Sequence, residues 1–242
     1  MDIFDDLERE LAQLESMLES LTADQWASPS SAIGWSVADV VLHLAQTEEA
    51  VALTANSPAE AGWSDDGEAV DDRVEQWVQR ERVEPSATFE RWRVAHRHAV
   101  ATLRAADPMR KIRWAAAPLK PATLATTRIA EHWAHALDIA VPLGIDHPDT
   151  DRLRHIAWLG YNTLPYAFRL AGIDPQPVFV RLISPSGATW TFGAPSATTH
   201  VRGTASEFCR IGARRLSPED SAVVATGPLA TDTLRLLRNY AR

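Results

Sequence analysis

Apolar residues recur every three or four positions at the start of the chain, which is the spacing of one face of a helix. These positions are Ile3, Leu7, Leu11, Leu14 and Leu18. Serine and proline then predict a loop over residues 23–34. A second helix is expected from Ser36, with Asp39 placed for a capping box, to about Thr54.

Two further helical stretches follow in the first part of the chain. The third covers about residues 68–106 and is interrupted before Pro85, with Ser86 expected to cap its restart. The fourth covers about residues 122–143 and ends at Gly144, because glycine commonly terminates helices. Four helical stretches of this length, joined by loops, predict an antiparallel bundle.

After His147 the pattern changes to short alternating stretches separated by turn residues. Helices are expected over about residues 150–171, 206–214 and 229–240, and strands over about residues 177–183, 188–192, 200–202 and 222–225. We therefore expect an α+β protein, with a helix bundle in residues 1–147 and a small α+β domain in residues 148–242.

Composition narrows the class of protein. The 242 residues carry 24 basic and 32 acidic side chains, a formal net charge of −8, which argues against a nucleic-acid partner. A single cysteine, Cys209, excludes an intramolecular disulfide and a zinc site built on several thiolates. The acidic N-terminus does not resemble a secretory signal, and no apolar stretch reaches the roughly 18 residues that span a bilayer. We therefore expect a cytoplasmic protein with no membrane partner.

Ionisable residues gather on one stripe of the fourth predicted helix. Arg128, Glu131, His135 and Asp138 follow one another at three- and four-residue spacing, so they are neighbours on one helix face. Glu131 and His135 can direct lone pairs at one metal ion. Asp138 can accept the proton of the other imidazole nitrogen of His135 and so orient that ring. Arg128 could hold Glu131 or an anionic substrate.

Two other interpretations fit the same helix. The spacing also describes a solvent-facing helix whose charged side chains form ion pairs with one another. In addition, His132 can replace Glu131 as a metal ligand, because it forms an i, i+3 pair with His135.

His43 offers a further ligand from the second predicted helix. It lies in the apolar run VVLHL (40–44), where a histidine is either a hydrogen-bonded core residue or a ligand. Some partner is expected, because burying a polar ring without one costs about 1–3 kcal/mol. Together with Glu131 and His135, His43 would make a site with three protein ligands and positions open to water or substrate, the pattern of catalytic zinc.

Several runs of sequence resemble a known family. GWSVADVVLHLA (34–45) resembles the second-helix motif of the DinB-like metal-binding bundles. RIAEHWAHALD (128–138) resembles the fourth-helix motif of the mycothiol-dependent maleylpyruvate isomerases, and TWTFG (189–193) and ATGP (225–228) resemble the C-terminal α+β domain of that family. The similarity extends over nearly the whole chain, and its motifs are specific to the superfamily rather than to one reaction.

The resemblance implies a DinB-like four-helix bundle that holds a divalent metal, usually zinc, on His43, Glu131 and His135. It also implies mycothiol or a similar low-molecular-weight thiol as cosubstrate, in an isomerase or S-transferase that acts on a small electrophile. Members of the family bind substrate carboxylates with arginines near the metal. The candidates for that role here are Arg93, Arg113 and Arg128.

Two other functions stay open alongside the thiol enzyme. One is a metal-binding protein without turnover, and the other is a hydrolase that uses metal-bound water, which needs the same three ligands. Two imidazoles and a carboxylate suit zinc, nickel and iron alike. Exposed members of the nine tryptophans would be consistent with a homodimer.

Overall fold

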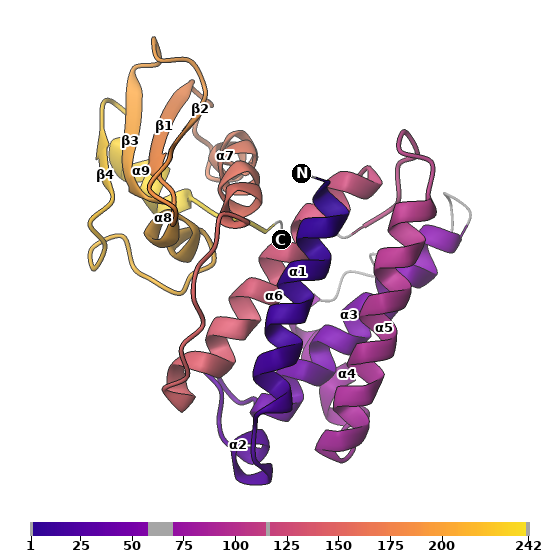
Figure 1. Ribbon diagram of the computed structural model, residues 1–242. Coiled ribbons are helices and arrows are strands. Elements are labelled where there is room, and N and C mark those ends of the chain that lie inside the picture. Colours follow the sequence, from indigo (N-terminus) through magenta and orange to yellow (C-terminus); the bar gives the residue numbers. More distant parts are fainter. Residues whose placement is uncertain (1, 58–69, 115–116, 241–242) are drawn as a thin grey trace. The chain divides into compact units, whose positions relative to one another are not determined.

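Helices dominate the chain up to His147, and a small sheet follows (Figure 1). The structure is a computed structural model that describes residues 2–57, 70–114 and 117–240. The contacts within the chain divide it into two compact units, and the boundary along the sequence falls between His147 and Pro148. The first unit is helical and the second mixes strands with helices, in agreement with the predicted α+β class.

The first unit is built from helices that pack side by side. They are α1 (Ile3–Glu19), α2 (Ala23–Ala27), α3 (Val37–Asn56), α4 (Val70–Arg80), α5 (Pro85–Ala105) and α6 (Pro121–Leu143). The longest of these, α1, α3, α5 and α6, pack against one another. The apolar stripe predicted on α1 is confirmed for Leu7, Leu11 and Leu14, which are all buried in the core of this unit.

Local signals set the ends of the two helices that matter most for the site. The Ser36 hydroxyl accepts a hydrogen bond from the N–H of Asp39, and the Asp39 carboxylate accepts one from the N–H of Ser36. This capping box begins α3 as predicted. Helix α6 ends at Gly144, whose φ of 64° lies in the left-handed region that favours glycine.

Two predictions in this unit are wrong. Helix α2 lies where a loop was expected, because Thr22 and Gln25 form a capping box that satisfies the first N–H groups of a short helix. The restart at α5 is not capped by Ser86: the helix begins at Pro85, with Glu84 before it and no side-chain cap. Proline suits this first position because its φ is preset and its missing N–H would have no helical partner there.

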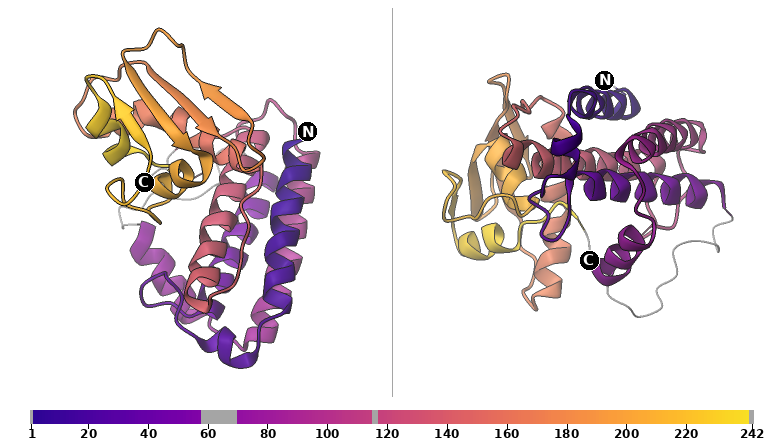
Figure 2. Two further views of the ribbon diagram at one scale, coloured as in Figure 1. Left: turned by 60° about the vertical axis from the view of Figure 1, so that its left-hand side comes forward. Right: turned by 90° about the horizontal axis from the view of Figure 1, so that it is seen from below.

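The second unit contains a four-stranded mixed sheet and helices. Its elements are α7 (Leu153–Leu170), β1 (Val178–Ile183), β2 (Thr189–Phe192), β3 (Thr199–Thr204), α8 (Ala205–Gly212), β4 (Val224–Thr226) and α9 (Ala230–Leu236). The strands lie side by side in the order β2-β1-β3-β4 (Figure 2). β1 and β3 are parallel, and the two outer pairs are antiparallel.

One face of this sheet is buried and the other is exposed. Val180, Leu182, Trp190 and Val201 lie on the buried face, and α7 and α8 pack against the strands that carry them. Alternate residues of the same strands point to the opposite face and are largely exposed. The alternation predicted from the sequence therefore reflects a sheet covered by helices on one side.

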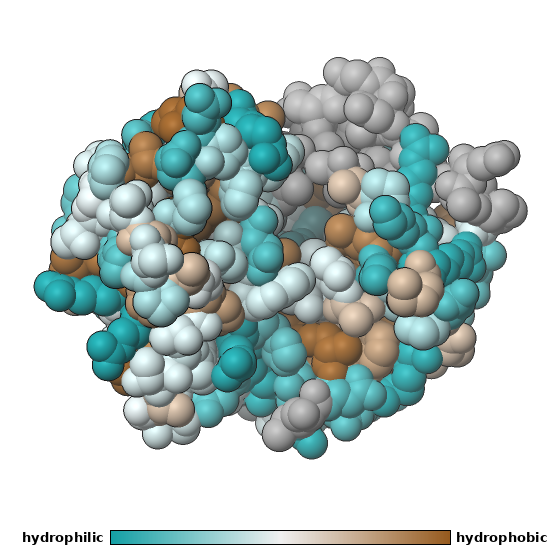
Figure 3. Space-filling view, turned by 90° about the horizontal axis from the view of Figure 1, so that it is seen from above, coloured by the Kyte–Doolittle hydropathy of each residue, from teal (hydrophilic) through white to brown (hydrophobic). Residues whose placement is uncertain are grey.

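The surface of the molecule is largely polar where it is visible. On the face drawn in Figure 3, hydrophilic residues predominate and hydrophobic residues form separate patches. Among the described residues, no helix has the length and apolar character needed to cross a membrane.

Candidate metal centre

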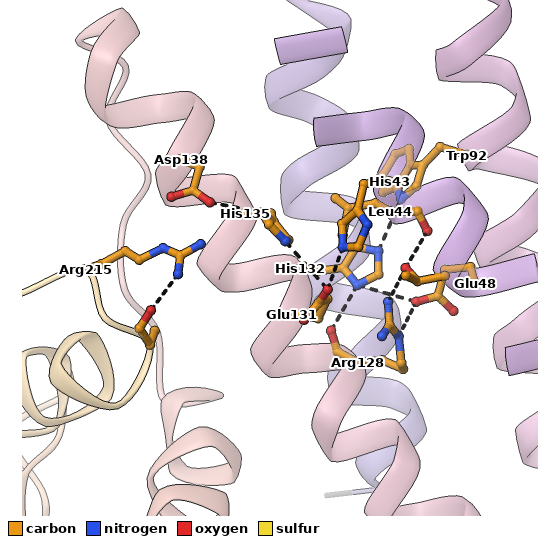
Figure 4. A network of polar contacts seen from close by, with 12 residues as sticks. His43, Leu44, Glu48, Trp92, Arg128, Glu131, His132, His135, Asp138 and Arg215 are labelled. Atoms are coloured by element: carbon orange, nitrogen blue, oxygen red, sulfur yellow. Dashed lines mark hydrogen bonds and ion pairs between the residues drawn. The ribbon is translucent and has the colours of Figure 1, made fainter. Parts of the chain in front are cut away.

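The fold brings His43 of α3 together with Glu131 and His135 of α6 (Figure 4). The Nε2 atom of His43 lies 2.9 Å from Oε1 of Glu131, and the Nε2 atom of His135 lies 3.6 Å from the same oxygen. The three groups each offer one ligand atom, and these atoms all lie within 4.8 Å of one another. Three residues from two helices therefore present two imidazole nitrogens and one carboxylate oxygen to a common point.

His43 is held in an environment that keeps its imidazole neutral. The residue is 7 % exposed, and the Trp35 ring lies 5.2 Å from its ring, centroid to centroid. Burial lowers the pKa of His43, and this effect outweighs the hydrogen bond with Glu131, which acts in the opposite direction. A neutral imidazole has a lone pair that it can donate to a metal ion.

His135 is oriented by Asp138, one helical turn further along α6. Their Nδ1 and Oδ2 atoms lie 2.9 Å apart, so the Nδ1–H donates to the carboxylate and Nε2 faces Glu131. Burial acts to lower the pKa of His135, but the hydrogen bonds with Asp138 and Glu131 raise it to about 9. Burial likewise acts to raise the pKa of Glu131, yet its contacts with His135 and His43 hold it well below its usual value.

The structure places His132 outside this cluster. Its Nδ1 lies 2.9 Å from the carbonyl oxygen of Arg128, and because a carbonyl only accepts, this nitrogen carries the hydrogen. Its Nε2 then accepts a hydrogen bond of 3.2 Å from the Trp92 indole. Both ring nitrogens are therefore engaged in the core, on the side of α6 that faces α5, so the sequence alternative of His132 in place of Glu131 has no geometric support.

Arg128 lies one turn before Glu131 and is bound to α3. It is 3 % exposed, its Nε donates to Oε1 of Glu48 at 2.6 Å, and its Nη2 donates to Oγ1 of Thr47 at 2.8 Å. Burial raises the pKa of Glu48, which the charge of Arg128 opposes. Glu48 was not predicted as a partner of Arg128 from the sequence. The signal that was available is Thr47, which follows His43 by one helical turn and extends its polar stripe along α3.

Arg93, a second candidate for binding substrate, is paired with α1 instead of α3 or α6. Arg93 of α5 forms an ion pair of 2.7 Å with Glu15 of α1, and its guanidinium lies 5.4 Å from the centre of the Phe89 ring. Arg113 is exposed in the segment between α5 and α6.

His96, another buried histidine, packs against Trp92 of α5. Its ring centre is 4.5 Å from that of Trp92, and its Nε2 lies 3.7 Å from the Glu15 carboxylate. Burial lowers the pKa of His96 to about 4, against the opposing effect of Glu15.

The burial of His96 should make the stability of the protein depend on pH. Between pH 6.5 and about 4 the unfolded chain binds a proton on His96 and the folded chain does not, so the free energy of unfolding should fall as the pH falls through this window. The contribution should be about 3 kcal/mol, at 1.36 kcal/mol for each pKa unit. Urea unfolding of the native protein and of His96→Leu across these pH values measures it.

The exposed neighbour His98 provides the matched control for this measurement. His98→Leu should keep the pH dependence of the native protein, whereas His96→Leu should lose part of it. Parallel stability curves for the native protein and His96→Leu between pH 4 and pH 6.5 would contradict the assignment.

Comparisons with known proteins identify the relatives of this chain. Residues 7–140 match the family model described as the mycothiol maleylpyruvate isomerase N-terminal domain. Two uncharacterized proteins of Mycobacterium tuberculosis, from strains CDC 1551 / Oshkosh and H37Rv, are each 36 % identical over 246 residues, covering 98 % of this chain and 94 % of theirs.

Two solved structures share the fold. The crystal structure of a mycothiol-dependent maleylpyruvate isomerase matches with a TM-score of 0.64 and 16 % identity, and that of a histidine-to-alanine mutant with a TM-score of 0.62 and 14 % identity. Each match covers 93 % of this chain and 91 % of the solved chain. The family model spans more than half of the sequence, so the chain belongs to the family defined by the mycothiol maleylpyruvate isomerase N-terminal domain.

Proposed function

We propose that this protein is a metal-dependent enzyme of thiol chemistry that uses mycothiol as cosubstrate. It would act as an isomerase or an S-transferase on a small electrophile. The observation that carries the proposal is the convergence of the His43, Glu131 and His135 ligand atoms within 4.8 Å. The choice of mycothiol is supported by the family of the chain and by its structural similarity to a mycothiol-dependent maleylpyruvate isomerase.

The donor set fits a divalent metal such as zinc. In a tetrahedral zinc site with bonds of 2.0–2.2 Å, neighbouring ligand atoms are about 3.4 Å apart. The separations of 2.9 and 3.6 Å around the Glu131 carboxylate bracket that value. Two imidazole nitrogens and one carboxylate oxygen are also the donors of known catalytic zinc sites, which keep one position open for a substrate or water. A metal ion would take the place of the Nε2 proton that the raised pKa of His135 favours.

The residues of the chain would divide the work. His43, Glu131 and His135 would hold the metal, and Asp138 would fix the orientation of His135. A bound zinc ion lowers the pKa of a thiol that coordinates it, so that mycothiol could be held as a thiolate at neutral pH. The thiolate sulfur would form a bond to an electron-poor alkene carbon of the substrate, while the electron pair of the double bond moves onto the adjacent carbonyl oxygen. In an isomerase, rotation about the resulting single bond would be followed by return of that pair, which re-forms the double bond and expels the thiolate. In an S-transferase, the enolate would instead take a proton from solvent and the sulfur would stay on the substrate.

The reactive sulfur would have to come from the small molecule. Cys209, the single cysteine of the chain, is buried in α8 and its Sγ–H lies 3.6 Å from the carbonyl oxygen of Leu153. Burial raises the pKa of this thiol well above its usual value, which disfavours the thiolate.

Arg128 and Arg93 are the two arginines proposed to interact with an anionic substrate, and they differ in how they are held. Arg128 would contribute a positive charge one turn from Glu131 that favours a substrate carboxylate, while its own hydrogen bonds go to Glu48 and Thr47. Arg93, which is paired with Glu15, would need to leave that ion pair to reach a substrate.

The test of the proposal is stabilisation of the zinc-loaded protein by mycothiol. A thiol that binds only the folded state at 100 times its Kd should stabilise the protein by about 2.7 kcal/mol, seen as a rise in Tm. An analogue of mycothiol that lacks the sulfur should give a much smaller shift, and turnover of maleylpyruvate with and without mycothiol then tests the reaction.

The outcome also separates the competing functions. Equal Tm values with and without every thiol tested would overturn the thiol enzyme. Zinc binding without any thiol effect would leave a metal-binding protein, and thiol-independent hydrolysis by the zinc-loaded protein would identify a hydrolase.

A further inference from the structure

The exposed face of the sheet in the second unit carries an arginine on each of its two central strands. Arg181 of β1 and Arg202 of β3 are Cα partners in the parallel register, and both side chains are exposed. Adjacent strands lie about 4.8 Å apart, so the two guanidinium groups start from neighbouring positions on one face. Thr191 of β2 and Val224 of β4 complete this row across the sheet.

The charge of this pair is not balanced on the sheet. None of the strand residues on the exposed face is acidic. In the part of the chain that the structure describes, neither guanidinium forms an ion pair or a hydrogen bond. Like charges directly opposite each other on neighbouring strands are destabilising, so the fold carries a cost at this row.

The carboxylate that follows the pair along the chain is already occupied. Glu207 accepts hydrogen bonds from the Thr204 hydroxyl and from the N–H of Ala222. The positive charge of the face therefore stays available to a binding partner, in a chain whose overall charge is −8.

Apolar side chains flank the arginines on the same face. Ile183 follows Arg181 on β1 and is 44 % exposed, and Val224 lies beside Arg202 on β4 and is 42 % exposed. Arginine next to exposed apolar side chains, without acidic neighbours, is the composition found in the centre of protein–protein interfaces.

We propose that this exposed face of the four-stranded sheet binds an acidic segment of a partner protein. Carboxylates of the segment would pair with Arg181 and Arg202, and its apolar side chains would cover Ile183 and Val224. Complementary charge of this kind guides association and sets the register of the partner.

Other occupants fit the face less well. A second copy docked face to face by two-fold symmetry would bring four guanidinium groups together, since such an interface uses the same patch on both copies. A single-stranded nucleic acid would need aromatic side chains on which its bases stack. The aromatic residue of the face, Phe179, is half-buried, with the His200 ring edge-on at 5.4 Å.

The experiment uses the full-length protein and a labelled peptide that alternates glutamate with leucine, with a glutamine–leucine peptide as its neutral match. Fluorescence anisotropy at low salt should show binding of the glutamate peptide only. Arg181→Gln or Arg202→Gln should each weaken binding by about fivefold, and the double variant by about 25-fold, because an exposed ion pair contributes up to about 1 kcal/mol. Added salt should weaken binding of the native protein.

Arg169→Gln, at an exposed position in the last turn of α7, is the matched control and should bind the peptide like the native protein. The double variant should keep or raise the Tm of the native protein, because it removes a like-charge pair rather than a stabilising contact. The proposal is overturned if the glutamate peptide does not bind, if the glutamine peptide binds equally, or if the double variant binds as well as the native protein. Tighter binding of oligodeoxythymidylate, or self-association that depends on the two arginines, would also overturn it.

Discussion

Replacing Arg128 with methionine should lower the free energy of unfolding by about 3–5 kcal/mol, because it leaves a buried carboxylate without its charged partner. Glu48 is 1 % exposed, and Arg128 is the cation that donates to it. The Thr47 hydroxyl would also lose the hydrogen bond that Nη2 of Arg128 donates to it. Urea unfolding of the metal-free protein, followed by circular dichroism, measures the change.

A double variant separates the cost of an unpaired charge from the loss of packing. Arg128→Met combined with Glu48→Leu should recover most of the stability, because apolar residues of similar volume can replace a buried ion pair at little cost. Arg104→Met is the surface control: Arg104 pairs with Asp5 and Glu8 on α1 at the surface, and its loss should lower the free energy of unfolding far less than the loss of Arg128. If Arg128→Met is no more destabilising than Arg104→Met, the buried pair does not support the fold as described.

Removing either histidine of the candidate metal centre should abolish stoichiometric zinc binding. His43→Ala and His135→Ala each leave two protein donors, one of them the Glu131 carboxylate. Asp138→Asn keeps all three donors but weakens the orientation of His135, so we expect zinc affinity to fall by about 10–100-fold. Elemental analysis after dialysis and competition with a chelating dye measure these effects independently of any activity.

The chain offers matched controls for each change. His98→Ala removes an exposed histidine and Asp146→Asn an exposed aspartate, and both variants should keep one zinc per chain. The proposed ligand set is wrong if His43→Ala and His135→Ala both retain stoichiometric zinc while remaining folded by circular dichroism.

Much of the fold could be predicted because its signals are local. The capping box at Ser36 and the left-handed Gly144 involve residues within a few positions of each other, and both predicted helix ends are confirmed. The two wrong predictions also concern local signals, but at these positions two signals compete. Thr22 and Gln25 begin a short helix inside a segment whose serines and prolines favour a loop, and Pro85 itself takes the first helical position that Ser86 was expected to cap.

The sequence by itself determined which residues share one face of α6. Glu131, His135 and Asp138 are neighbours there because the helix repeats every 3.6 residues, whatever lies opposite. This spacing was sufficient to predict that Asp138 accepts a hydrogen bond from the His135 ring, and the Nδ1 and Oδ2 atoms lie 2.9 Å apart.

Only the tertiary structure decided what each of these side chains meets. The packing of α3 against α6 brings His43 to Glu131 and Glu48 to Arg128, while the packing of α5 turns the Trp92 indole to His132. The pairing of Arg181 with Arg202 likewise depends on the register between β1 and β3. Contacts between elements depend on their packing angle and register, which arise from the whole core and not from the spacing within one element.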